Sequence, residues 1–473
     1  MKKLLLFSLL LAFMAIMITC SKEEASQNPT PTPGFSFEGT SPIPPAQQRT
    51  GDPAAGYDYL VEGDYVSSGI PYGAFTLVSG TGDNFLNRTG DNADIPYEFT
   101  AVDAPNGIRV VAPNCMQCHA AKINGEFVLG LGSHDYDFTK DQSAIIPTAS
   151  AVISSLYGGA NSPEFQAYDP FRKAVEATAP YLVTETIGVN PADKITAILA
   201  AHRDPWSLEW QDQPSEPIPP LLIPTDVPAW WLLKKKNAMF YTAIGRDDFC
   251  RFMMASSLLT MSDSTKARAV DDKFNDVLAF INSIEAPAYP FPINTTLAEQ
   301  GERLYDEHCE GCHGSYGTDA TYPNLLVTVD RVGTDPLLSE AYQNQSLSNF
   351  INWFNDGWFS QNPGSAQLVS DGGYVAQPLD GIWATAPYLH NASVPTLEDL
   401  LNSTQRPTYW KRTYQSSDYD TEKLGWNYST PDSKVDKKTY DTTLPGYSNQ
   451  GHRFGDKLSS SERTALIEYL KTL

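Results

Sequence analysis

The chain has 473 residues, 41% of them hydrophobic and 11% aromatic, so it can bury well-formed cores, and global disorder is excluded. Its formal net charge of −23 at pH 7 excludes nucleic acid as a partner, because phosphate groups repel so acidic a surface. Frequent glycine and proline, 32 and 35 residues, predict short helices joined by long ordered loops.

Residues 1–20 have the form of a secretory signal peptide, in which two lysines precede an apolar run that ends near Cys20. The run is too short to span a bilayer comfortably. Polar residues follow Cys20 directly, which resembles a bacterial lipoprotein whose cysteine is lipidated after cleavage. We expect an exported protein, anchored to a membrane by lipid at Cys20, in the periplasm or at the cell surface. An ordinary cleaved signal with an incidental cysteine is the alternative.

Four of the six cysteines form two pairs, and each pair is followed at once by a histidine. The two strings are Cys115-Met116-Gln117-Cys118-His119 and Cys309-Glu310-Gly311-Cys312-His313. Two thiols three positions apart share one helical turn, where they can add to the two vinyl groups of haem while the histidine meets the iron. The chain is therefore predicted to carry two covalently attached haem c groups.

Other uses of these cysteines fit the sequence less well. A zinc site would need further cysteine or histidine ligands at ribbon or finger spacing, and none stands near either motif. A thioredoxin-like pair would need a βαβ setting, which the pattern does not contain. The remaining thiol, Cys250, lies among aromatic residues, so we expect it to be buried and inert.

The first predicted haem domain follows a tether. Residues 21–50, rich in Ser, Thr, Gln and Pro, are expected to link the lipid flexibly to this domain. Residues 51–290 would form the domain itself. Its closing helix is predicted by apolar residues at helical spacing from Val270 to Ile284, and a proline-rich linker ends that pattern.

Residues 291–473 have the order of a small cytochrome c domain. A capping box at residues 296–299 is expected to open its first helix, and a second at residues 459–462 to open its last. The last helix carries one apolar stripe, so the two helices should pack on each other behind the haem. The predicted fold class is thus mainly α with long ordered loops, in two cytochrome c-like haem domains of which the N-terminal one is enlarged.

What each haem can do depends on the ligand opposite its histidine, because two strong ligands give an electron carrier and a vacant face gives chemistry. All eight methionines lie before residue 262, so the C-terminal domain has none for its haem. His308 adjoins a cysteine on the proximal helix and is badly placed to reach round the ring. His452 follows a glycine that lets the backbone approach a haem edge, so we expect His452 as sixth ligand of the His313 iron. His390 is expected near the propionates or at the domain interface.

For the N-terminal haem, with His119 as its proximal ligand, spacing does not choose a sixth ligand. The candidates are His134, His202, Met239, Met253, Met254 and Met261. Methionines in such apolar company are more often core residues than ligands. An open iron face is one hypothesis for this domain, and closure by His134 or His202 is the other.

Four stretches carry a family resemblance: Trp383–Leu397, Asp226–Tyr241, Gln405–Pro407 and Asn449–His452 together with the closing helix. They resemble the di-haem cytochrome c peroxidase superfamily, and most closely its branch containing rubber oxygenase. The similarity runs from about residue 100 to the C-terminus. These motifs are specific for the superfamily and not for one substrate.

The resemblance implies an N-terminal haem with an open or weakly ligated face that meets peroxide or dioxygen, and a six-coordinate C-terminal haem with His452 as ligand. It also implies an aromatic residue such as Trp231 between the haems, where a core tryptophan is the alternative. A calcium ion between the domains occurs in relatives, but no ligand loop here identifies one. Gln377 replaces a usual arginine and Ala392 a usual glycine, both near the second haem.

The sequence therefore favours a di-haem oxidoreductase that reduces peroxide or activates dioxygen at the N-terminal haem. Electrons would reach it through the C-terminal haem from a redox partner protein or a quinol-linked donor. Peroxide chemistry needs an acid–base group, for which Glu209, Asp247 and Asp248 are candidates, although such carboxylates usually face solvent. No distal aromatic residue for polyisoprene cleavage is identified, so rubber is not the expected substrate. The alternative is a pure electron-transfer cytochrome whose irons both have six ligands.

Overall fold

The computed structural model describes residues 38–361 and 365–473, and residues 37–473 form one compact unit. The predicted signal peptide over 1–20, the lipidation site Cys20 and most of the predicted tether lie outside the described residues. Within the described part of the chain, no helix is long and apolar enough to cross a membrane.

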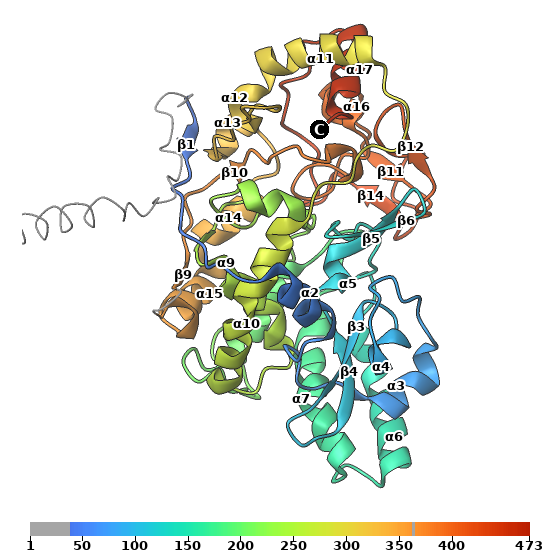
Figure 1. Ribbon diagram of the computed structural model, residues 1–473, viewed down its shortest axis with the longest axis vertical. Helices are drawn as coiled ribbons and strands as arrows, with labels where there is room; N and C mark the ends of the chain where they lie inside the picture. The colour runs from blue at the N-terminus through green and yellow to red at the C-terminus, as the bar shows by residue number, and fades with distance from the viewer. Residues whose placement is uncertain (1–37, 362–364) are drawn as a thin grey trace, which may run out of the picture. The chain divides into compact units, whose positions relative to one another are not determined.

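Helices and short strands alternate around the first haem motif (Figure 1). The helices of this half are α2 (Pro53–Glu62), α3 (Tyr72–Ser79), α4 (Gly90–Ala93), α5 (Met116–His119), α6 (Ile146–Tyr157), α7 (Pro163–Thr178), α8 (Ala192–Ala201), α9 (Phe249–Met253) and α10 (Ser264–Ser283), with the 3₁₀ helix η3 (Trp230–Lys235). The strands are β1 (Thr40–Pro42), β2 (Ile70–Pro71), β3 (Phe99–Asp103), β4 (Arg109–Pro113), β5 (Ala120–Ile123), β6 (Glu126–Leu129) and β7 (Gly245–Asp247). β2, β4 and β3 form an antiparallel sheet in that order, and β5 pairs with β6 directly after the first motif.

The second half begins with α11, which ends directly before the second motif. Its helices are α11 (Thr295–His308), α12 (Glu310–His313), α13 (Val329–Val332), α14 (Leu337–Gln343), α15 (Gln345–Asn355), α16 (Leu397–Leu400) and α17 (Ser460–Leu470). Its strands are β8 (Leu325–Val327), β9 (Ala366–Leu368), β10 (Tyr374–Val375), β11 (Tyr409–Lys411), β12 (Tyr419–Asp420), β13 (Gly425–Trp426) and β14 (Thr439–Asp441). β8 lies between β1 and β10, β11 pairs with β14, and β12 pairs with β13.

α11 and α17 pack on each other, as their apolar stripes predicted (Figure 1). The capping box of α17 is confirmed, because Ser459 and Glu462 exchange side-chain to backbone hydrogen bonds. α11 begins earlier than its predicted capping box: Asn294 caps it by accepting a hydrogen bond from the Leu297 amide. The two helices approach most closely at Gly301, where a β-carbon would lie 2.0 Å from the Ala465 carbonyl oxygen.

The predicted helix before residue 284 is also confirmed as α10. Its buried face carries Val270, Phe274, Val277 and Ile281, each at most 1% exposed. α2 packs on this helix, and Gly56 permits the contact because a β-carbon there would overlap the Asp276 carbonyl. These two helices form one side of the core around the first motif.

The expected division into two cytochrome c-like haem domains is wrong. β7 and β9, assigned by the sequence to different domains, pair with Gly245 opposite Leu368. Tyr342 of α14 and Phe354 of α15, both from the expected C-terminal domain, belong to the core around the first motif. Segments that complete one another's core cannot bury their apolar faces separately, so a single unit results. Small sheets of two or three strands accompany the helices, so "mainly α" is also corrected to a mixed fold.

The described end of the predicted 21–50 tether is held against this unit. Thr40 to Pro42 form β1 and pair with β8. Arg49 forms an ion pair with Asp248 at 3.0 Å and another with Asp271. The predicted boundary at 290 lies in the extended segment between α10 and α11.

We expect Gly301→Ala to lower the free energy of unfolding. Helix propensity alone favours alanine by about 1 kcal/mol, whereas overpacking of a tight contact typically costs about 1–3 kcal/mol. Because of the contact with Ala465, the substitution should therefore destabilise the protein rather than stabilise it, as measured by urea unfolding. Glu299→Ala, on the exposed face of the same helix, is the control. A Gly301→Ala variant more stable than the parent would show that α11 and α17 do not pack this closely.

Candidate haem sites

The two Cys-x-x-Cys-His motifs fold into the same helical turn. In the first, the Cys118 and His119 amides donate to the Cys115 carbonyl at 3.2 and 3.0 Å. The second motif repeats these two bonds, at 3.1 and 3.0 Å, in Cys309, Cys312 and His313. All four thiols are free rather than joined in disulfides. Each turn thus presents two thiols and an imidazole together, which is the donor set that covalent haem requires.

The first motif lies on the wall of a cavity of about 690 Å³. This volume falls within the range of cofactor pockets, roughly 300–1,000 Å³. Burial lowers the pKa of His119 to about 4, so its imidazole is neutral and able to bind a metal at physiological pH. Its Nδ1 is buried without a hydrogen-bond partner among the described residues, and Trp230 stacks on the ring at 4.7 Å. The residues present fit a haem at this position.

The structure separates the six candidate sixth ligands of this haem. Met239 and Met253 line the cavity. His202 is instead stacked on Trp210 at 4.8 Å, with its Nδ1 at 2.9 Å from the Gln211 carbonyl. The other three candidates, His134, Met254 and Met261, are buried and do not line the cavity. Neither histidine that the electron-transfer hypothesis required therefore lines the site.

Two carboxyl–phenol pairs line the same cavity. The Tyr241 hydroxyl donates to Asp226 Oδ2 at 2.5 Å, and the Tyr342 hydroxyl donates to Asp193. Burial raises the pKa of Asp226 to about 7, and it raises that of Asp193 as well. A carboxyl group with a pKa near neutrality can both hold and release a proton at the working pH.

These pairs were missed by the sequence reasoning. The candidates named there, Glu209, Asp247 and Asp248, do not line the cavity. Asp248 caps α9 and pairs with Arg49, which is a structural role. Asp226 and Tyr241 are the two ends of one of the stretches that carry the family resemblance. Their place in that stretch was the signal by which the sequence could have indicated this pair.

The second motif faces His452. The His313 Nδ1 donates to the Gln377 carbonyl at 2.7 Å, which leaves its Nε2 lone pair for a metal. The centroids of the His313 and His452 rings are 6.2 Å apart. Metal–imidazole bonds are about 2 Å long, so one ion between two imidazoles separates the ring centroids by roughly 6 Å. The two rings thus have the spacing of paired axial ligands, and His452 as sixth ligand stays a prediction that this geometry supports.

The loop before His452 is built to hold this ring. Gly451 has φ +78° and approaches the backbone of Gly333, where any β-carbon would overlap. The His452 amide donates to the Val332 carbonyl at 2.7 Å. Arg406 donates to the carbonyls of Gly451 and His452 at 2.7 and 3.2 Å. Arg406 is therefore a positioning residue for the predicted ligand.

Two adjacent tryptophans, Trp230 and Trp231, are buried in different hydrophobic cores. Trp230 belongs to the core around His119, whereas Trp231 belongs to the core that contains Tyr305 of α11. Trp231 is 1% exposed, and its indole N–H donates to the Asp380 carbonyl at 2.8 Å. Trp231 is thus a buried member of the second core. Its place between the haems and its part in electron transfer stay predictions.

His390 lies near a residue of the first cavity wall. Its ring stacks on Tyr374 at 4.1 Å and is 6.5 Å from Tyr241, which lines that cavity. Ala392, for which the resemblance implies a usual glycine, has φ +57°, a conformation that glycine adopts more easily. Cys250 is fully buried and burial raises the pKa of its thiol, so it is unreactive as expected.

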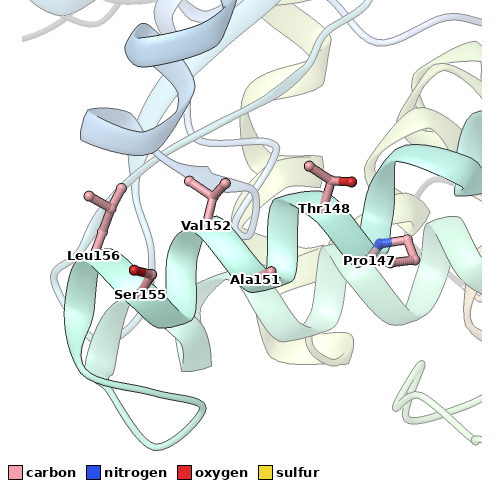
Figure 2. Close-up of a pocket in the computed structure, with 6 residues that line it drawn as sticks. All are labelled: Pro147, Thr148, Ala151, Val152, Ser155 and Leu156. Carbon is pink, nitrogen blue, oxygen red and sulfur yellow. The ribbon is translucent and has the colours of Figure 1, made fainter.

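No chemistry is assigned to two further features. A shallow groove of about 570 Å³ runs along α6, where Thr148, Val152 and Leu156 point to one side (Figure 2), and none of its lining residues is ionisable.

In the described part of the chain, no three His, Cys, Asp or Glu side chains are grouped to hold a metal ion. The calcium ion of the resemblance stays a prediction.

Comparisons with known proteins agree with the cytochrome motifs. Residues 373–411, which include Gln377, His390 and Arg406, match a family described as RoxA-like, cytochrome c-like. This match supports a rubber-oxygenase-like di-haem cytochrome branch and a covalent haem c, and the wider peroxidase superfamily stays a prediction. Two relatives from Sinorhizobium fredii are the uncharacterized proteins y4iJ, 32% identical over 240 residues, and y4iM, 27% identical over 300 residues. The matches cover 38% and 54% of this chain, and they span 39% and 66% of the relatives' lengths.

We expect His452→Ala to change the ferric spectrum of the haem at His313 from low-spin to high-spin, because a strong axial nitrogen is lost. Optical absorption of the purified holoprotein is the measurement. His308→Ala removes an exposed histidine beside the same motif and should leave the spectrum unchanged. A low-spin spectrum that persists in His452→Ala would mean that another group is the sixth ligand.

Proposed function

We propose that the protein is an exported di-haem c-type oxidoreductase that reduces peroxide or activates dioxygen at the haem held by His119. Electrons would be relayed by the haem held by His313, from a redox partner protein or a quinol-linked donor. A haem supplies one-electron and oxygen chemistry when it is bound. The signal-like residues 1–20 and Cys20 support export and a lipid anchor to a membrane, in the periplasm or at the cell surface.

The observation that carries this proposal is the difference between the two histidine sites. His313 faces a second imidazole at the spacing of paired ligands. His119 faces a cavity on whose described wall it is the sole histidine. A closed site suits electron transfer and an open site suits a reacting molecule.

The carboxyl–phenol pairs supply the proton chemistry that the proposed reaction needs. Reduction of one hydrogen peroxide consumes two electrons and two protons and releases two waters. Asp226 can deliver a proton to the cavity at neutral pH, because burial raises its pKa to about 7. Tyr241 donates its hydroxyl hydrogen to this carboxyl and keeps it oriented on the wall. Asp193 and Tyr342 offer a second such pair.

A pure electron-transfer cytochrome is the second candidate, and two methionines favour it. Met239 and Met253 both line the cavity beside the first motif. A thioether bound to the His119 iron would close its sixth position and raise its reduction potential. The two functions differ in a simple observable, because only the oxidoreductase would consume peroxide or dioxygen at that iron.

We expect Asp226→Asn to slow peroxide reduction by about 10²-fold or more, because a positioned proton donor contributes on this scale. The experiment mixes the two-electron-reduced holoprotein with hydrogen peroxide and follows haem re-oxidation by stopped-flow absorption. Asparagine keeps an oxygen that can accept the Tyr241 hydrogen bond, so the cavity wall should persist. Glu209→Gln, which removes an exposed carboxyl outside the cavity, should react at the parent rate.

The same carboxyl predicts the pH dependence of the reaction. The rate should fall as pH rises through about 7, because the fraction of Asp226 that carries a proton falls. Asp226→Asn should lose this step in the profile, measured by the same stopped-flow method. If the parent protein shows no reaction with peroxide and none with dioxygen, the oxidoreductase is refuted and the electron carrier remains.

A further inference from the structure

Three consecutive lysines follow Trp231: Lys234 and Lys235 end η3, and Lys236 is its C-terminal cap. Their surroundings differ. Lys234 pairs with Glu285 and Lys235 with Asp380, each at 2.7 Å. Lys236 is the most buried, at 8% exposure, and has no carboxylate within ion-pair distance among the described residues. Its ammonium group donates to the side-chain oxygen of Gln377 at 3.0 Å.

This arrangement leaves two buried donors without an anion. A buried ammonium beside a neutral amide is costly, since burial removes it from water and no opposite charge compensates. Burial lowers the pKa of Lys236 to about 7, which reflects this cost. The Gln377 side-chain nitrogen is also buried and has no hydrogen-bond partner in the described part of the chain. Both groups call for one acceptor that the chain itself does not supply.

The pair lies between the two histidine sites. Lys236 lines the cavity beside Cys115 and His119. Gln377 reaches the other site, because its backbone carbonyl accepts the hydrogen bond from His313. An anion bound to Lys236 would therefore lie at the wall of the first cavity. It would also contact Gln377, whose backbone carbonyl orients the His313 imidazole.

We propose that the Lys236 ammonium and the Gln377 amide bind a propionate carboxylate of the haem attached at Cys115 and Cys118. The inference rests on the proposed function for the presence of that haem. A carboxylate offers two oxygens, one for each donor, and charge-assisted hydrogen bonds of this kind are the strong ones. A propionate anion stabilises the more positive ferric state of its haem. The Lys236 charge neutralises this anion, and it thereby raises the reduction potential of the haem.

The test compares reduction potentials of both haems in the purified holoprotein, by spectroscopic redox titration. Lys236→Met removes the charge and keeps the side-chain length. We expect the midpoint potential of the His119 haem to fall, by enough to shift its redox equilibrium about tenfold, or 59 mV for one electron. Lys236→Arg should retain the parent potential to a large extent. Lys234→Met, which removes the neighbouring lysine and its ion pair with Glu285, is the matched control and should leave both potentials unchanged.

A second measurement reports the propionate itself. Resonance Raman bands of propionate bending respond to hydrogen bonding, and those of the His119 haem should move to lower frequency in Lys236→Met. Gln377→Leu removes the second donor but keeps the backbone carbonyl that holds His313, so it should produce a smaller shift of the same sign. This variant answers the question if Lys236→Met does not fold.

Several results would overturn the proposal. Unchanged potentials and Raman bands in both variants would show that no propionate binds here. A parent potential that changes with added chloride or phosphate would assign the position to a dissolved anion instead. Failure of the proposed function looks different, since a chain with one haem by pyridine haemochrome assay, or one inert to peroxide and dioxygen, would show it in the parent protein.

Discussion

A buried imidazole can bind a metal only if it is neutral and one nitrogen is free, and both histidine sites of this protein depend on that constraint. Burial keeps His119 and His452 neutral, with pKa values of about 4 and 3. The Gln377 carbonyl fixes the proton of His313 on Nδ1 and so leaves the lone pair of Nε2 free for a metal. The loop clamped by Arg406 then sets the 6.2 Å spacing of the two rings.

The single compact unit makes the two sites depend on each other. Tyr342, Phe354 and Leu368 come from the second half of the chain and line the cavity beside the first motif. In the opposite sense, the stretch from Asp226 to Tyr241 belongs to the first half but contacts the second. Its Trp231 and Lys235 donate hydrogen bonds to Asp380. Both halves of the chain therefore contribute residues to the cavity beside the first motif.

Local features of this structure could be predicted from the sequence, and long-range ones could not. Spacing or capping within a few residues predicts the two motif turns, α10 and α17. The glycine before His452 is a local signal of the same kind. The joining of the two halves could not be predicted, because the pattern of α14 and α15 shows an apolar face but not which core covers it. Asp193 and Tyr342 meet across 149 positions, and Lys236 and Gln377 across 141, so no local pattern marks either pair.

Electron paramagnetic resonance of the ferric protein can distinguish an open iron at His119 from a closed iron at His313. The spectrum would be recorded before and after one-electron reduction, with and without peroxide. We expect a low-spin signal from the haem at His313 and a high-spin signal from the haem at His119 that peroxide alters. Two low-spin signals that persist through half-reduction and ignore peroxide would contradict it and leave an electron carrier.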